Sequence, residues 1–522
     1  MITEDQTAVV AFLASPSTHG GAAVERIDTH ASVVFLAGQH AWKLKRAVRY
    51  DYLDFSTVER RKSMCEAELR INKRTAPGLY RRVVAVTRET DGSLALGGRG
   101  RPIEWLVEMS RFDQEGLLDR RAARNALDVE VMPTLASAIA RFHASAERRR
   151  DRGGKAAMAW VIDGNATGFA EQGGDALDAA ACAALTKAAH DVLERDAAHL
   201  DARRDAGFVR QCHGDLHLRN IVMLDGRPTL FDGIEFNDDI ACIDVLYDLS
   251  FLLMDLWHRK LPRHANAVLN AYLSETIDLD GVPLLPLFLS CRAAVRAKTS
   301  ATAARLHTDP ERRRELQATA RDYLSLAQRL LHPPPPCLIG VGGLSGSGKS
   351  TLARAIAPLV GAAPGAVVIR SDVIRKHLCG VDPLQRLGRE GYTTETSRRV
   401  YGTLIDRASL VVRSSHAAIA DAVFGRPSDR EALEQSAGAA GAAFVGLWLD
   451  APEAELTARA GRRERDASDA DAEVIRSQLA QDAGVITWHR VDASSTPEQA
   501  LRQAMVILDR QLKNKVGAAN GR

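Results

Sequence analysis

The sequence lacks the features of a secreted or membrane-spanning protein. Its seven cysteines are scattered and include no C-x-x-C pair, which predicts reduced, mostly buried thiols rather than disulfides or zinc ligands. The N-terminus carries acidic residues early and no basic stretch before an apolar one, so no signal peptide is expected. No apolar run approaches the roughly 20 residues that cross a bilayer. We therefore expect a cytoplasmic protein without a membrane partner.

A strong excess of charge of either sign is also missing. The 69 basic and 66 acidic residues give a formal net charge of +3. This balance does not favour a nucleic-acid partner, although a local basic patch would still allow one. What the chain does have is length, since 522 residues are too many for a single core and two to four domains are expected.

The clearest motif is a complete Walker A sequence, or P-loop, of the form G-x-x-x-x-G-K-S. Backbone N–H groups of such a loop can cradle phosphates at the start of a helix. Lys349 would reach the β- and γ-phosphate oxygens of ATP and act in catalysis, and the Ser350 hydroxyl would ligate Mg²⁺. The residues assigned to nucleotide binding here are Gly343, Ser345, Gly346, Ser347, Gly348, Lys349, Ser350 and Thr351.

Strand and helix patterns alternate after this loop, which predicts a doubly wound, five-stranded parallel sheet. Asp372 follows the second predicted strand and is placed to bind an acceptor hydroxyl as a base. Arg375 would hold an anionic acceptor, and Asp421, which closes the third strand, would hold the metal through water. The strands are expected at 338–341, 366–369, 417–420, 444–449 and 485–489.

This half of the sequence resembles the small P-loop kinases, which include gluconate, shikimate, polynucleotide and zeta-toxin-like kinases and the chloramphenicol-phosphorylating type. Arg459 and Arg463 match the catalytic arginines of the lid in that group. The half shows neither a clean acidic Walker B pair nor a following helical lid domain, which argues against a ring-forming ATPase. The P-loop alone nevertheless attracts the general label of an AAA family ATPase.

A second phosphate-handling motif lies upstream, in the sequence H-G-D-L-H-L-R-N that begins at His213. Asp215 is placed to accept the hydrogen bond of an attacking hydroxyl, and Asn220 is spaced to reach a metal from the same loop. Asp232 follows a short predicted hairpin and would bridge the metal to the phosphates. Past it come three acids that would suit a polycationic acceptor: Glu235, Asp238 and Asp239.

Nucleotide contacts in this first half are expected from a β-rich segment. Lys43 is the preferred phosphate-clamping lysine, and Lys45 points the same way along its predicted strand. The carboxylate partner is expected on the following helix, with Glu68 preferred and Glu66 in reserve. The segment from Val107 to Met109 would offer backbone groups to adenine.

The H-G-D-x-x-x-x-N motif with Asp232 and Asp248 resembles the aminoglycoside and choline phosphotransferases, over most of residues 25–305. The resemblance implies an α+β protein-kinase-like fold in which Asp215 is catalytic and Asn220 and Asp232 hold magnesium. The sequence departs from the protein-kinase pattern because no clear Gly-rich loop precedes Lys43. The whole chain resembles a bacterial fusion of two kinase-like domains.

Four consecutive prolines at 333–336 cannot continue a helix and mark the expected linker. We expect a kinase-like domain at 1–332, with a small lobe at about 1–110 and a large lobe at about 111–332, and a P-loop kinase domain at 337–522. The favoured function is a bifunctional ATP-dependent phosphotransferase acting on hydroxyls of small-molecule acceptors. Two alternatives stay open: a regulatory ATP-binding protein with one degenerate domain, and RNA 5′-hydroxyl phosphorylation by the C-terminal domain.

Overall fold

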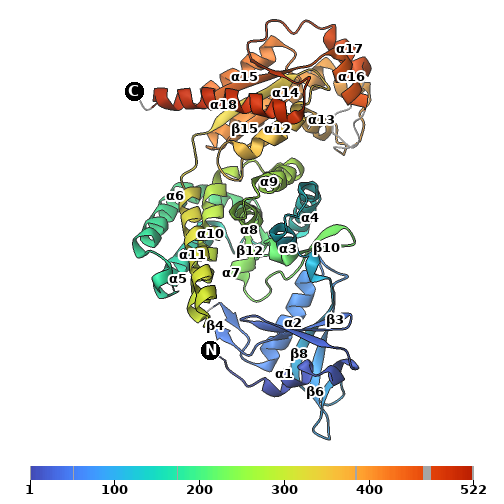
Figure 1. The fold of residues 1–522 in the computed structure, drawn as a ribbon, viewed down its shortest axis with the longest axis vertical. Coiled ribbons are helices and arrows are strands. Elements are labelled where there is room, and N and C mark those ends of the chain that lie inside the picture. The colour runs from blue at the N-terminus through green and yellow to red at the C-terminus, as the bar shows by residue number, and fades with distance from the viewer. Residues whose placement is uncertain (1, 51, 173, 383–384, 462–471, 520–522) are drawn as a thin grey trace. The chain divides into compact units, whose positions relative to one another are not determined.

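The chain forms two compact units in a computed structural model that describes residues 2–50, 52–172, 174–382, 385–461 and 472–519 (Figure 1). One unit combines Met1–Glu171 with Thr186–Asp255, and the other combines Gln172–Leu185 with Leu256–Arg522. The first unit holds the H-G-D motif with its expected lysine and carboxylate partners, and the second holds the P-loop. No helix among the described residues is both long and apolar enough to cross a membrane.

The first unit begins with a six-stranded antiparallel sheet in the order β1-β2-β3-β8-β6-β7. In β3, Trp42 and Leu44 face a cluster with α1, whereas Lys43 and Lys45 both reach α2 on the opposite face. The alternation along β3 therefore places both lysines as the sequence predicts. The elements are α1 (Thr7–Ala14), β1 (Val24–Asp28), β2 (Ser32–Ala37), β3 (His40–Lys45), β4 (Arg49–Tyr50), β5 (Leu53–Asp54), α2 (Val58–Asn72), β6 (Tyr80–Arg88), β7 (Leu94–Leu96) and β8 (Arg101–Ser110).

Mostly helical structure follows the sheet, interrupted by two short strand pairs. Strand β9 pairs with β12, and β10 pairs with β11 in the hairpin that separates the H-G-D loop from Asp232. A β lobe followed by a helical lobe is the kinase-like plan expected from sequence. The elements are α3 (Leu118–Ala123), α4 (Met132–Ser145), α5 (Gly154–Gln172), α6 (Ala179–Asp205), β9 (Val209–Gln211), β10 (Ile221–Leu224), β11 (Arg227–Leu230), α7 (Asp238–Ala241), β12 (Cys242–Asp244) and α8 (Val245–His258).

The second unit is built on a five-stranded, wholly parallel sheet in the order β14-β15-β13-β16-β17. This confirms the predicted sheet, except that the last strand lies at β17 (His489–Asp492) and not at 485–489. Val485 is 82% exposed, so the apolar residues that suggested a strand belong to the preceding loop. The other elements are α9 (Pro262–Thr276), α10 (Leu285–Leu306), α11 (Pro310–Leu330), β13 (Cys337–Gly343), α12 (Lys349–Ile356), β14 (Val367–Arg370), α13 (Ser371–Leu378), α14 (Thr394–Arg413), β15 (Ala418–Asp421), α15 (Pro427–Ala439), β16 (Ala443–Asp450), α16 (Glu453–Gly461), α17 (Ala472–Leu479) and α18 (Pro497–Ala519).

Helix α9 is bonded to the outer edge of this sheet by two asparagines. Asn266 Nδ2 donates to the carbonyls of Pro364 and Ala366, at 3.2 and 3.1 Å. Asn270 Oδ1 accepts the N–H of Val368 at 2.6 Å, and its Nδ2 donates to Ala366 O at 3.1 Å. These amides satisfy backbone groups that an edge strand leaves unpaired. The P-loop sheet is therefore held by a helix that precedes the proline run.

Candidate active sites

A buried carboxylate holds the backbone of the H-G-D loop through hydrogen bonds. Asp248, on α8, is fully buried and accepts the backbone N–H groups of His213 and Gly214, at 3.1 and 2.9 Å. Its Oδ2 also lies 3.0 Å from His143 Nε2. His213 Nε2 lies 2.9 Å from Phe231 O, and burial lowers the pKa of His213. These contacts hold the backbone that leads into Asp215.

Asp215, Asn220 and Asp232 are brought to one end of this loop. Asn220 Nδ2 donates to Asp215 Oδ2 at 2.9 Å and to the Asp215 carbonyl at 3.0 Å. The Phe231 N–H donates to Asn220 O at 3.0 Å, which places the next residue, Asp232, beside the loop. Asp232 has a φ of 61°, and its N–H donates to the Tyr80 hydroxyl. An amide and a carboxylate oxygen so placed are hard donors that fit Mg²⁺.

Both candidate lysines contact the same carboxylate. Lys43 Nζ donates to Glu68 Oε1 at 2.8 Å, and Lys45 Nζ donates to Glu68 Oε2 at 2.7 Å. Lys43 also contacts Asp232, and Lys45 also contacts Glu235. Lys43 is 13% exposed and Lys45 is 1% exposed. The structure therefore places Lys43 at Asp232, the expected metal ligand, and the more buried Lys45 at Glu235.

Burial and charge act in opposite directions on this cluster. Burial alone would raise the pKa of Glu68, but the ammonium groups of Lys43 and Lys45 lower that pKa to about 2. Burial lowers the pKa of Lys43, but Asp232 and Glu68 outweigh it and raise the pKa well above its usual value. Burial also lowers the pKa of Lys45, but Glu235 and Glu68 outweigh it and raise that pKa above its usual value. Glu68, Lys43 and Lys45 are therefore charged at neutral pH, and Lys43 offers a fixed cation to phosphate oxygens.

Other predicted residues of the first site have different surroundings. Glu66 is exposed and lies 3.7 Å from Lys62, one helical turn away. Val107 and Met109 lie in β8, whose backbone is paired on both sides by β3 and β6. Their ladder bonds would compete with adenine, so the segment after Ser110 is better placed to meet a base. The acids past Asp232 all have cationic partners: Glu235 contacts Lys45, Asp238 contacts Arg149 and Asp239 contacts Arg152.

The P-loop follows β13 and leads into α12, as its sequence predicts. Gly346 has a φ of 86°, and a Cβ there would lie 2.3 Å from Leu456 O, so only glycine fits. Lys349 Nζ donates to Leu344 O at 2.9 Å. Ser350 Oγ donates to Asp421 Oδ2 at 2.5 Å, and this hydroxyl–carboxylate pair at the end of β15 suits Mg²⁺. Asp421 thus lies at the P-loop hydroxyl, where the sequence places a metal-binding group.

Asp372 lies in the first turn of α13, next to the end of β14, and Arg375 lies in the last turn of that helix. Burial raises the pKa of Asp372, while Arg370, Lys349 and Arg375 act to lower it. Arg375 is buried: its Nη1 donates to Gly391 O at 2.8 Å and its guanidinium lies over the Tyr392 ring. The Arg375 contacts support the connection between α13 and α14, so its expected role with an acceptor stays a prediction.

The structure describes only one of the two predicted lid arginines. Arg459 Nη1 donates to Ala493 O at 2.6 Å, and Arg459 lies 3.2 Å from Glu455 on the same helix. Arg463 lies outside the described residues. Arg459 is therefore seen against the segment that follows β17, where its guanidinium faces backbone carbonyls.

Two side chains that contact the P-loop belong to no motif that the sequence analysis identified. Gln478, on α17, accepts the Ser345 N–H at 2.9 Å and donates to Ser345 Oγ at 3.0 Å. Arg370 Nη2 donates to Ser350 Oγ at 3.2 Å. Neither residue belongs to the Walker A pattern, and only the strand register and the position of α17 bring them to the loop.

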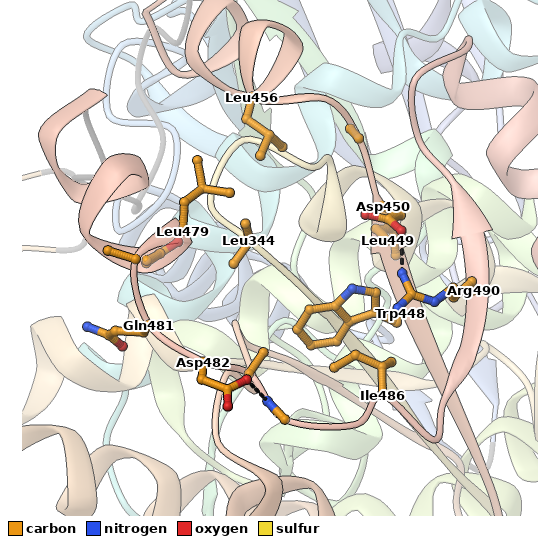
Figure 2. Close-up of a pocket in the computed structure, with 15 residues that line it drawn as sticks. Leu344, Trp448, Leu449, Asp450, Leu456, Leu479, Gln481, Asp482, Ile486 and Arg490 are labelled. Carbon is orange, nitrogen blue, oxygen red and sulfur yellow. Dashed lines mark hydrogen bonds and ion pairs between the residues drawn. The ribbon is translucent and has the colours of Figure 1, made fainter.

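A cavity of about 480 Å³ opens beside the P-loop (Figure 2). The Trp448 ring forms part of its wall, together with Leu344, Leu456, Gln478 and Ile486. Its volume is in the usual range for small-molecule sites. Because Leu344 and Gln478 belong to or touch the P-loop, a molecule bound at the loop has room to extend into this cavity.

Comparisons with known proteins find a family model for each of the two parts of the chain. Residues 65–285 match the model of the phosphotransferase enzyme family, and residues 338–483 match that of an AAA domain. A choline/ethanolamine kinase family protein from Mesorhizobium loti is 14% identical, with a TM-score of 0.38, and covers 62% of this chain and 94% of its own. A gluconokinase from Sinorhizobium meliloti is 23% identical, with a TM-score of 0.27, and covers 35% of this chain and 97% of its own.

The similarity to two mycobacterial relatives extends over almost the whole chain. Uncharacterized proteins of Mycobacterium tuberculosis and Mycobacterium bovis are 30% identical over 497 residues, which is 92% of this chain and 94% of theirs. The chain therefore belongs to the same family as these mycobacterial proteins, and it joins a phosphotransferase-family kinase-like domain to a P-loop kinase-like domain.

Proposed function

We propose that the protein is a bifunctional ATP-dependent phosphotransferase, in which each domain transfers the γ-phosphoryl group of ATP to a hydroxyl of a small-molecule acceptor. The observation that supports this proposal is that each unit holds its own cluster of groups of the kinds that bind phosphate and metal. Lys43, Asp215 and Asp232 supply them in the first unit, and Lys349 with Ser350 supplies them in the second.

In the first site, Asp215 would accept the proton of the acceptor hydroxyl as its oxygen bonds to the γ-phosphorus. The bond from that phosphorus to the β,γ-bridging oxygen breaks, and ADP leaves. Lys43, held by Glu68, would neutralise the phosphate oxygens, and Asn220 and Asp232 would hold Mg²⁺. Bound Mg²⁺ supplies charge neutralisation between the β- and γ-phosphates.

In the second site, Asp372 would take the role of Asp215. Its pKa is raised by burial, which makes it a better proton acceptor than a free carboxylate when it is ionised. Backbone N–H groups of the P-loop and Lys349 would bind the phosphates, and Ser350 with Asp421 would hold Mg²⁺.

The test is a metabolite-pool screen for ATP-dependent phosphorylation with the full chain and with Asp215→Asn, Lys349→Met and the double variant. Each single variant should lose one set of phosphorylated products by at least about 100-fold and keep the other set. Asp225→Asn, at the exposed β10–β11 turn, and Arg502→Met, on the exposed side of α18, serve as charge-matched controls that keep both.

Loss of all products in one single variant would contradict bifunctionality and would leave the other domain a regulatory role. Retention of all products in the double variant would overturn the proposal. Phosphorylated RNA 5′ ends that depend on Lys349 would replace the small-molecule acceptor for the second domain.

A further inference from the structure

Arg370, the last residue of β14, lies against the two residues that would hold the metal at the P-loop. Its Nη2 donates to Ser350 Oγ at 3.2 Å, and its Nε lies 3.3 Å from Asp421 Oδ2. The Arg370 side chain is 17% exposed and that of Asp421 is 4% exposed. The position follows from the register of the sheet, because Arg370 and Asp421 are direct partners across β14 and β15.

This contact uses the oxygen atoms that a metal would need. Ser350 Oγ donates its proton to Asp421 and accepts a hydrogen bond from Arg370. A hydroxyl has few lone pairs, so a metal bound by Ser350 would compete with the guanidinium for the same oxygen. The two cations would also repel each other at this range. Loading the site with metal therefore favours release of Arg370 from Ser350.

A released Arg370 stays within the site, since its backbone is fixed in β14. Asp372 lies two residues further along the chain, and the charges of Arg370 and Lys349 both act to lower its pKa. Arg370 and the P-loop lysine therefore both lie near Asp372. A bound triphosphate brings its γ-phosphate into this group of charges. A planar guanidinium is well suited to bind such oxygens, and a strand-end arginine loses little freedom in doing so.

We propose that Arg370 is a catalytic residue of the P-loop site with two positions. Without metal it occupies the cation position at Ser350 and Asp421, and with metal and ATP bound it contacts the γ-phosphate. There it stabilises the charge on the transferring phosphoryl oxygens. This inference rests on the proposed function only in requiring that the P-loop binds a metal–nucleotide complex.

The test uses the full chain with Arg370→Gln, and Arg413→Gln at the exposed end of α14 as the matched control. Mn²⁺ binding in the presence of ADP is measured by electron paramagnetic resonance. Signal that Lys349→Met removes is assigned to the P-loop site. Arg370→Gln should bind Mn²⁺ there roughly three- to tenfold more tightly, because it removes a competing charge, whereas the control should match the parent.

Calorimetric titration with ADP and with the ATP analogue AMP-PNP, both with Mg²⁺, gives the second readout. The preference of the P-loop site for the triphosphate over the diphosphate should fall about tenfold in Arg370→Gln. Arg370→Lys keeps the charge and should keep the parent's Mn²⁺ affinity while losing part of the triphosphate preference. If Arg370→Gln fails to fold, the triphosphate preference of Arg370→Lys carries the test.

A merely structural role for Arg370 would weaken metal binding and both nucleotides together. Unchanged or weaker Mn²⁺ binding in Arg370→Gln, or an unchanged triphosphate preference in either variant, would overturn the inference. If both binding shifts are seen but no phosphorylated product forms, the two positions of Arg370 are supported and the proposed function is contradicted. A parent protein whose P-loop binds no metal–nucleotide complex would overturn both.

Discussion

The two proposed sites would bind phosphate with different kinds of groups from different parts of the chain. In the first unit, Lys43 and Lys45 are held by carboxylates from α2 and from the segment after β11, in contacts that span up to 190 residues of sequence. In the second unit, the phosphate cradle is a single loop between β13 and α12. The first site therefore depends on buried charges that must balance, and the second depends mainly on backbone shape.

We therefore expect substitutions in the first site to lower mainly the stability of its unit, and substitutions in the P-loop to lower mainly nucleotide binding. Removing a charge from the first site leaves other buried charges without partners, so its fold should suffer. The P-loop lysine donates to a backbone carbonyl, so its loss should affect nucleotide binding more than the fold. The predictions below test this contrast, from the largest expected effect to the smallest.

Glu68→Gln should produce the largest effect. The change removes the anion that both lysines share, and breaking a buried ion pair typically lowers the free energy of unfolding by about 3–5 kcal/mol. Hydrogen exchange of amides in β3 and α2 reports on the first unit alone. Glu66→Gln, on the exposed face of the same helix, is the control and should change exchange little. Equal effects of the two variants would contradict a charge-dependent first unit.

The two lysines should respond differently to the same substitution. Lys45→Met leaves buried Glu235 and part of Glu68 unpaired, so it should destabilise the first unit by about 3 kcal/mol. Lys43 is more exposed and contacts Asp232, so Lys43→Met should lower turnover at the first site by about 100-fold with a smaller loss of stability. Turnover and denaturant unfolding, measured on both variants, separate the roles. The reverse pattern would place Lys45 at the phosphates.

Sequence patterns predict the second unit better than the first, for a physical reason. The Walker A loop is contiguous, so its position after a buried strand already implies the cradle. The choice between Lys43 and Lys45 cannot be made from sequence, because residues two apart on a strand share a face and Glu68 has two oxygens. Glu235 as the partner of Lys45 depends on how β3 meets a distant loop, which no local pattern encodes.

The same limit applies within the parallel sheet. Asp372 and Asp421 are predicted because acidic residues at strand ends face the phosphates. Arg370 ends a predicted strand just as Asp421 does, but its function depends on β14 lying beside β15. The misplaced last strand has a simpler cause, since an apolar Val485 in an exposed loop imitates a strand start.

Asn266→Ala tests whether the second site depends on the contacts that α9 makes with the edge of the sheet. The variant takes the Asn266 amide from the buried Pro364 carbonyl and leaves Ala366 O with the amide of Asn270. Loss of such a partner typically lowers the free energy of unfolding by about 1–3 kcal/mol. Because β14 carries Arg370 and leads to Asp372, nucleotide affinity should also fall. Arg263→Ala, exposed on the same helix, is the control. Unchanged stability would show that the P-loop sheet needs nothing from α9.

The smallest expected effect concerns pH and His416. This histidine is buried, its Nε2 lies 3.0 Å from Gly365 O, and burial lowers its pKa below the usual 6.5. The unfolded chain therefore takes up the proton first as pH falls through about 6.5, and stability of the second unit should decline below that pH.

His416→Gln keeps a donor to Gly365 but cannot titrate, so it should flatten this decline. Between pH 7 and 5.5, the difference in melting temperature between parent and variant should change by a few degrees. His489→Gln removes an exposed histidine from the same unit and should leave the parent's pH profile intact. A profile that His416→Gln does not flatten would assign the acid sensitivity to other groups, and the second unit would then share the charge dependence expected of the first.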